Sequence, residues 1–138
     1  MKLSTKGRYG LKAMLELAIR YNEGPISIKY IAESQDIPER YLEQLFSKLK
    51  KSGLIKSIRG AQGGYMLMDE PSKISVGDIL RVLEGPISIS ECISEDGKCS
   101  KQSKCATRLV WKRMKKAIDE VVNTTYLQDI VDDWKEIN

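Results

Sequence analysis

The residues with the most distinctive chemistry in this chain are its cysteines, which all lie in one short polar segment. Six residues separate the first from the second and five separate the second from the third; they are Cys92, Cys99 and Cys105. Their neighbours are mainly serines, lysines and acidic residues, which are costly to bury, so we expect an exposed loop. Thiolates on such a loop can ligate an iron–sulfur cluster, hold a structural zinc ion or oxidise reversibly without a metal. The chain contains no histidine that would complete a metal site.

A second group of chemically useful residues lies on a predicted helix that starts at Pro38 and ends at Gly53. Its apolar face, at helical spacing, consists of Leu42, Leu45, Phe46 and Leu49. Near the start of the helix, the other face carries Arg40, Tyr41, Glu43 and Gln44. Arginine can pair with guanine, glutamine with adenine and glutamate with cytosine, so this face has groups that read base edges. An ordinary solvated helix face is also charged, and this pattern alone does not separate the two interpretations.

The stretch LIKSIRGAQGGYMLM, after this helix, is predicted to form two short strands around a glycine-rich loop. Arg59 stands at the tip, where an arginine can enter a narrow minor groove. Glycines such as Gly60 let the backbone approach phosphates, and Ser57 lies just before the tip on the first strand. A plain hairpin turn is the alternative interpretation.

The elements that must position these residues begin with two helices. Apolar residues at helical spacing predict a helix over 5–21, capped by Ser4 or Thr5, and a second helix capped by Ser27. Helix, helix, tight turn, helix and hairpin is the order of a winged helix-turn-helix, in which the later helix enters the major groove. We therefore expect a mainly α fold with a small β-hairpin wing.

The second half of the chain is predicted to be helical apart from the cysteine segment. Ser75 and Asp78 form a capping-box pattern before one helix. A helix over about 104–123 has a heptad-like seam, which needs a partner surface, and the seam consists of Val110, Met114, Ala117 and Val121. Thr125 with Gln128 is predicted to cap a last short helix.

Charge and composition narrow the classes of protein. Residues 1–65 carry 12 Lys+Arg and 6 Asp+Glu, net +6, and residues 66–138 carry 11 and 13, net −2. The basic first half favours a polyanionic partner. No apolar run approaches the roughly 18–20 residues of a membrane span, and the N-terminus lacks an apolar signal core. We expect a cytoplasmic protein with reduced thiols and no membrane partner. Without histidine, a nucleophile motif or a phosphate-binding loop, we expect no enzyme.

Three stretches of the sequence resemble the Rrf2 family of bacterial winged-helix regulators: LSTKGRYG, YLEQLFSKLKKSGLIKSIRGAQGGY, and LVW after the third cysteine. The resemblance covers nearly the whole chain except its tail. It implies a homodimer on double-stranded promoter DNA, with a long helix over 104–123 that crosses its twin. Each wing would place Arg59 in the minor groove.

The resemblance also implies roles for residues outside the wing. Tyr41, Glu43 and Gln44 match major-groove positions of the recognition helix. Tyr9 matches a position that contacts the DNA backbone. Arg40, like Pro38 before it, stands where many members of the IscR branch have serine.

Within the family, the chain resembles the IscR branch most closely, the regulators of iron–sulfur cluster biogenesis, and the cysteine triplet is what selects the sensing branches. This implies a cluster held by Cys92, Cys99 and Cys105, with 2Fe-2S expected over 4Fe-4S. It also implies a repressor of cluster-biogenesis operons, with cluster-assembly proteins as further partners. The parts of the chain would then be a DNA-binding domain over 1–85, a cluster-binding loop over 86–106, and a dimerisation helix with a C-terminal helix over 104–138.

The sequence departs from the IscR pattern in its cysteine spacing and in the fourth ligand. The first gap has six residues where that branch typically has five. The histidine that serves as the family's fourth ligand is replaced by Arg108, which stays protonated and cannot ligate. The nitric oxide-sensing branch takes a carboxylate from the partner's first helix, where this chain has Arg8. The sequence therefore does not identify the fourth ligand. A weaker ligand set would make the cluster more labile.

Two alternatives stay open beside a cluster-dependent repressor. The first is a cluster-free repressor of the same family that acts by thiol redox chemistry or in cysteine metabolism. Residues 77–88 also resemble the cysteine-metabolism repressors of the CymR type, which bind no cluster and lack the cysteine triplet. The alternative of another class is a cluster carrier or interaction module that binds no DNA.

Overall fold

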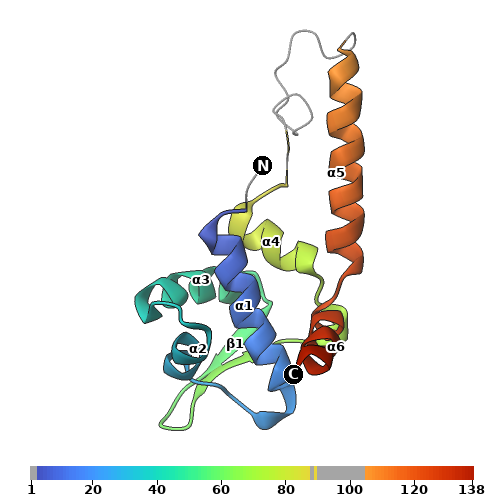
Figure 1. Cartoon of the computed structure of the whole chain (residues 1–138). Helices are drawn as coiled ribbons and strands as arrows, with labels where there is room; N and C mark the ends of the chain where they lie inside the picture. Colours follow the sequence, from blue (N-terminus) through green and yellow to red (C-terminus); the bar gives the residue numbers. More distant parts are fainter. Residues whose placement is uncertain (1–2, 88, 90–104) are drawn as a thin grey trace.

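The computed structural model describes residues 3–87, 89 and 105–138 (Figure 1). Its elements are, in chain order, α1 (Thr5–Ile19), η1 (Tyr21–Glu23), α2 (Ile28–Gln35), α3 (Glu39–Lys51), β1 (Ile55–Ile58), β2 (Gly64–Leu67), η2 (Pro71–Lys73), α4 (Val76–Glu84), α5 (Ala106–Thr124) and α6 (Leu127–Ile137). Figure 1 shows α1 to α4, the hairpin and α6 in one body, from which α5 extends as a long rod. This order confirms the predicted mainly helical, winged helix-turn-helix fold.

Side-chain caps start the helices as the sequence predicted. The Ser4 hydroxyl accepts an N–H from the first turn of α1 at 3.2 Å. The Ser27 hydroxyl accepts one from the first turn of α2 at 3.1 Å. Ser75 and Asp78 form the reciprocal capping box of α4. Each cap satisfies backbone donors that have no partner within the helix, which fixes where the helix begins.

The predicted cap of the last helix is wrong. Thr125 does not cap α6, because its hydroxyl donates to the carbonyl of Val121 at 2.6 Å and so closes α5. The Tyr126 N–H instead donates to the Asp129 carboxylate at 2.9 Å at the start of α6. The first helix also ends at Ile19, two residues earlier than predicted, and the 3-10 turn η1 follows it.

One apolar core joins α1, α2, α3, α4, the hairpin and α6. The predicted apolar face of α3 is buried in full, with every member at most 2% exposed. The largest fully buried side chains are Phe46, Met14, Leu17, Ile31, Leu42, Leu49, Ile55, Ile79 and Leu127. Burial of this stripe turns the opposite face of α3 to solvent.

The wing is tied to the chain segment that precedes α2. β1 and β2 pair antiparallel, with Ile58 opposite Gly64 next to the connecting loop. Ile26 forms an isolated bridge with Tyr65, through N–H to carbonyl bonds of 3.0 and 2.8 Å. Gly64 has φ +155°, and a Cβ there would lie 2.2 Å from the Ile26 carbonyl oxygen. A glycine at this position therefore allows the two segments to meet.

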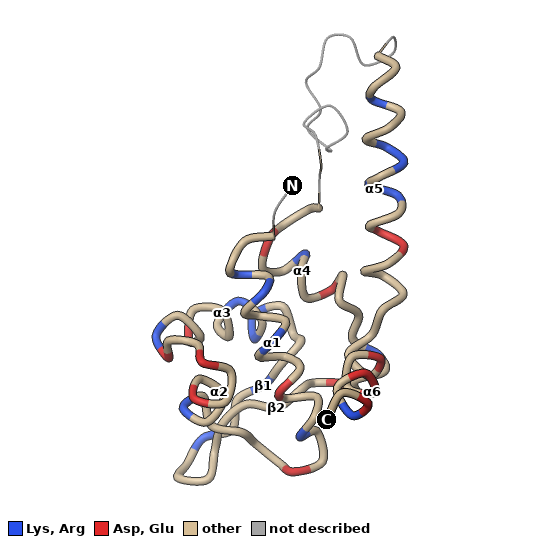
Figure 2. Tube along the Cα trace, in the orientation of Figure 1, with Lys and Arg blue, Asp and Glu red and all other residues tan. Residues whose placement is uncertain are grey.

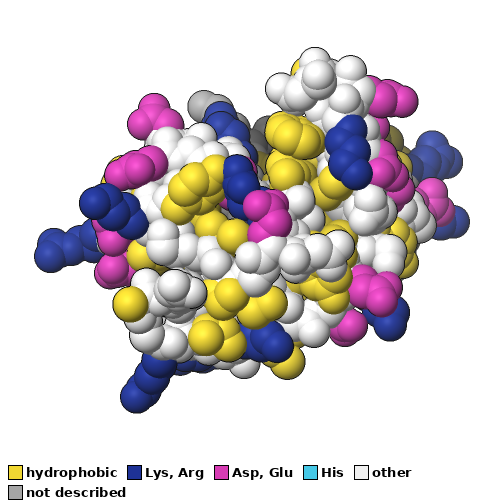
Figure 3. Space-filling model, turned by 90° about the horizontal axis from the view of Figure 1, so that it is seen from below, with side chains coloured by type: hydrophobic (Ala, Val, Ile, Leu, Met, Phe, Trp, Pro, Cys, Tyr) yellow, Lys and Arg dark blue, Asp and Glu magenta, His cyan; other side chains and the backbone are white. Residues whose placement is uncertain are grey.

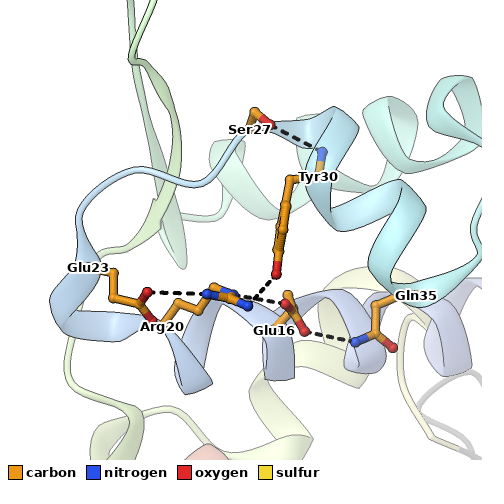
Figure 4. Close-up of polar contacts among 6 residues, drawn as sticks. All are labelled: Glu16, Arg20, Glu23, Ser27, Tyr30 and Gln35. Atoms are coloured by element: carbon orange, nitrogen blue, oxygen red, sulfur yellow. Dashed lines mark hydrogen bonds and ion pairs between the residues drawn. The ribbon is translucent and has the colours of Figure 1, made fainter.

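A polar network that the sequence did not reveal locks α2 against α1 (Figure 4). Glu16 is buried, and its two carboxylate oxygens accept from Arg20 Nε at 3.1 Å and Gln35 Nε2 at 3.0 Å. Arg20 also donates to Glu23 at 3.2 Å and to the Tyr30 hydroxyl, and its guanidinium lies 4.7 Å from the Tyr30 ring centroid. The network fixes the angle between the two helices that support α3.

α5 contacts the body mainly through its C-terminal turns. Val122 packs with Val76 and Leu80, and Arg81 Nη1 donates to Asn123 Oδ1 at 2.7 Å. Elsewhere on α5 large apolar side chains stay exposed, among them Leu109, Val110, Met114 and Val121. No described helix is long and apolar enough to cross a membrane.

Candidate nucleic-acid interface

The solvent-facing side of α3 forms the centre of the candidate interface. The helix begins at Glu39, one residue later than predicted, and Pro38 is its N-cap. Exposed side chains line a shallow depression along it, namely Arg40, Glu43, Gln44, Ser47, Lys48 and Lys51. The structure thus brings three of the four predicted base-reading residues onto one accessible surface. Their groups suit base edges, and the lysines suit phosphates.

Tyr41, the fourth of these residues, is held between α3 and α1. Its hydroxyl lies 3.1 Å from Thr5 Oγ1. Its ring meets that of Tyr9 edge-on, with centroids 5.8 Å apart and planes at 84°. Thr5 was not predicted as a site residue, because its partner Tyr41 lies 36 positions away and no local sequence pattern links the two. Tyr9 and Tyr41 are both half-buried, so they join the start of α3 to the start of α1.

The hairpin presents a positively charged tip. Arg59 and Gly60 are exposed, whereas Ser57 is half-buried on β1. Arg59 forms no salt bridge within the described part of the chain. The hairpin follows α3 in a fixed orientation, because the Leu54 N–H donates to the Leu49 carbonyl at 3.1 Å. An unpaired arginine on an anchored loop can reach into DNA without first breaking an ion pair.

Positive charge is spread over the molecule. Figure 2 shows Lys and Arg on α3 and along much of α5, with acidic residues on α6. Seen from below, the Lys and Arg side chains are dispersed among apolar and acidic ones (Figure 3). The candidate interface is therefore defined by the groups on α3 and the wing, and overall charge does not locate it.

The predicted cysteine site falls mostly outside the described residues, since Cys92 and Cys99 are not among them. Cys105 is the N-cap of α5, half-buried, with Sγ 3.1 Å from Thr107 Oγ1. The hydrogen bond from the Thr107 hydroxyl, and next that from the Arg108 backbone, lower the pKa of the Cys105 thiol. A thiol of this kind suits a metal ligand and a redox-active cysteine alike. The described residues contain no group of three acidic, cysteine or histidine side chains that would hold a metal.

Comparison with known proteins relates these features to a family of regulators. The model of the Rrf2 family, described as an iron-dependent transcriptional regulator, matches residues 3–133. The HTH-type transcriptional regulator CymR of Bacillus subtilis (strain 168) is 51% identical over 130 residues, covering 94% of this chain and 89% of CymR. The solved structure of CymR, the global cysteine regulator of B. subtilis, has a TM-score of 0.85 and 48% identity, covering 96% of this chain and 97% of that one.

IscR proteins are also similar. The structure of T. potens IscR has a TM-score of 0.83 and 46% identity, covering 100% of this chain and 91% of that one. IscR of Serratia proteamaculans (strain 568) is 37% identical over 131 residues, covering 95% of this chain and 79% of that protein. Identity to B. subtilis CymR exceeds identity to either IscR protein, so the expected closer similarity to the IscR branch is not supported. The matched residues and these identities show that the chain belongs to the Rrf2 family of DNA-binding transcription regulators.

Proposed function

We propose that the chain acts as a homodimeric repressor that binds promoter DNA at two half-sites related by a two-fold axis. The observation that supports this most directly is the exposed polar start of α3, together with an exposed Arg59 at the tip of the wing. In helix-turn-helix proteins the first residues of the recognition helix contact base edges. Arg40, Glu43 and Gln44 are accordingly assigned to the major groove.

The remaining predicted contacts are assigned to the minor groove and the DNA backbone. Arg59 enters the narrow minor groove, where an arginine is favoured by the negative potential. Ser57 and Gly60 lie beside it and approach phosphates. Tyr9 lies at the junction of α1 and α3, where its hydroxyl can contact the DNA backbone that flanks the major groove. Tyr41 lies at the same junction and stays assigned to the major groove with Arg40.

Dimerisation is proposed to occur through α5. The exposed apolar residues Val110, Met114 and Val121 lie along one side of this helix. A second copy of α5 would cover them. The two-fold axis of that dimer would also relate the α3 helices of the two protomers. Residues 1–85 then serve DNA binding, 86–106 form the cysteine-containing loop, and 104–138 supply the dimerisation helix and the C-terminal helix.

The DNA-binding proposal is tested with Arg59→Ala on a duplex that the protein itself selects from a random pool. We expect affinity to fall about tenfold, because the minor-groove contact is lost. The slope of log affinity against log salt should fall by about one per protomer. Lys135→Ala, which removes an exposed positive charge from α6, is the matched control and should change neither. Unchanged affinity in Arg59→Ala would contradict the wing assignment.

The target genes are proposed to serve cysteine metabolism. The support is the 51% identity to CymR of B. subtilis and the structural similarity to that global cysteine regulator. Sequencing of the source genome's fragments that the purified protein retains would test this. Enrichment of promoters for cysteine and sulfur metabolism is expected, and enrichment of cluster-assembly promoters alone would contradict it.

A second candidate is a repressor whose DNA affinity depends on an iron–sulfur cluster. Two observations favour it: the cysteine triplet and the similarity to T. potens IscR over the full chain. Cys92, Cys99 and Cys105 would hold the cluster, which we take to be 2Fe-2S, and a bound cluster would supply redox and oxygen sensitivity. Arg108 cannot be the fourth ligand.

Iron and sulfide analysis of protein purified without oxygen separates the two candidates. Near-stoichiometric iron and sulfide, lost in Cys99→Ala and kept in the neighbouring control Ser100→Ala, would support the cluster. Colourless, iron-free protein after reconstitution would reject it and leave a cluster-free cysteine regulator. If the protein selects no DNA, a cluster carrier or interaction module takes the place of both.

A further inference from the structure

α1 and α4 approach each other closely because two residues of α1 lack side chains. Gly7 and Gly10 are both buried against α4. A Cβ on Gly10 would lie 2.0 Å from Leu83 Cδ1, and one on Gly7 would lie 2.9 Å from Glu84 Oε1. This approach brings the first turn of α1 within hydrogen-bonding reach of Glu84, the last residue of α4.

Glu84 caps α1 from this neighbouring helix. Its Oε1 accepts the Gly7 N–H at 2.9 Å and the hydroxyl of Ser4, which is the N-cap of α1. The N–H groups of a first helical turn have no partners within the helix, and the positive end of the helix dipole favours a carboxylate there. These bonds, that of Ser4 first, hold the pKa of Glu84 below its ordinary value.

The same turns of α1 contact the start of α3. Thr5 follows the N-cap directly and lies 3.1 Å from the Tyr41 hydroxyl. Tyr9, one turn further on, packs edge-on against the Tyr41 ring. A continuous set of contacts therefore runs from Glu84 through Ser4 and the first turns of α1 to Tyr41.

We infer that Glu84 is a positioning residue for sequence-specific DNA binding, which it supports by fixing the start of α1 and, through Tyr41, the start of α3. This inference rests on the proposed function of α3. Its carboxylate has the wrong sign for a phosphate contact, so its effect must pass through α1.

The direction in which one substitution changes DNA affinity tests the inference. Glu84→Gln keeps the size of the side chain and removes its charge. Loss of a negative charge that acted only at long range would strengthen binding to every DNA. A positioning role predicts the opposite for the selected duplex, about a fivefold loss of affinity, because the charged cap is weakened. Affinity for a scrambled duplex and the salt slope should stay unchanged.

Two further variants complete the test. Glu136→Gln removes an exposed charge from α6 and should leave both affinities unchanged. Ser4→Ala removes the hydroxyl that donates to Glu84, and its effect should add only in part to that of Glu84→Gln, since both variants break the Ser4–Glu84 hydrogen bond. Circular dichroism confirms folding, and Ser4→Ala serves alone if Glu84→Gln does not fold.

The inference and the proposed function fail in different ways. Equal or stronger binding of the selected duplex by a folded Glu84→Gln variant, or an equal loss on both duplexes, would overturn the inference. If Arg59→Ala weakens binding in the same assay, DNA recognition by the wing stands regardless. If neither variant changes affinity, both the wing assignment and the inference about Glu84 are wrong.

Discussion

Glu16 shows how a charged residue is accommodated inside this protein. Its side chain is only 7% exposed, yet each carboxylate oxygen has a partner, Arg20 on the same helix and Gln35 on α2. Burial of a carboxylate is tolerated when it is paired and hydrogen-bonded, and removal of one partner leaves the others uncompensated. Glu23 pairs with the same arginine at 3.2 Å but is 57% exposed.

These two glutamates provide a matched prediction. Glu16→Ala should lower the free energy of unfolding by about 2–3 kcal/mol, because Arg20 and Gln35 lose their buried acceptor. Glu23→Ala should lower it by less than about 0.5 kcal/mol, because water replaces an exposed partner. Urea unfolding at one fixed protein concentration, followed by circular dichroism, measures both. Equal losses would mean that burial does not set the strength of this network.

At the residue scale, the sequence predicted which residues are exposed with useful chemistry better than it predicted which residues contact one another. The exposed positions of Arg40 and Gln44 were predictable from the helical period, and that of Arg59 from the glycine-rich loop around it. The role of Glu16 was not, because its amide partner lies 19 positions away on another helix. The same holds for Glu84, whose contact with Ser4 spans 80 positions.

At the element scale, local signals predicted the starts of three helices, whereas the close packing between helices depends on tertiary contacts. Ser4, Ser27 and Ser75 all cap as expected, since a cap needs only residues within one turn. The close packing of α1 on α4 had no such signal. From the sequence alone, a glycine inside a helix indicates only a weak helix former. The need for glycine at position 10 follows from the position of Leu83 on α4.

Gly10→Ala tests that explanation because propensity and packing predict opposite signs. Alanine is about 1 kcal/mol better than glycine inside a helix, so propensity alone predicts a more stable protein. The added Cβ would lie 2.0 Å from Leu83 Cδ1, so we expect a net loss of about 1–3 kcal/mol. Urea unfolding gives the sign. Ser34→Ala, on the exposed face of α2, should stay within about 0.5 kcal/mol of the parent. A more stable Gly10→Ala variant would show that α1 and α4 can separate without loss.

At the scale of the whole molecule, α5 is the element whose apolar side chains stay exposed in a single chain. Val122 is buried at its C-terminal end, whereas Val110, Met114 and Val121 are 45%, 39% and 63% exposed. The heptad-like spacing had predicted a seam that needs a partner, and the described part of the chain supplies none for it. A second copy of α5 would bury these side chains and place two DNA-binding bodies on opposite sides of a two-fold axis.

Met114→Asp tests this arrangement, because a charge placed in the seam must be desolvated when the helices pair. We expect the dimer dissociation constant to rise about 100-fold or more, with the monomer still folded, since the side chain already contacts solvent in the single chain. Light scattering after gel filtration gives the mass, and affinity for a duplex with two half-sites should fall while affinity for one half-site persists. Lys116→Asp is a strict control, because it changes the net charge by more than Met114→Asp does. Lys116 lies two residues after Met114, about 200° around the helix, and so points away from the seam. A Met114→Asp protein that stays dimeric and binds the full duplex normally would show that another surface pairs the protomers.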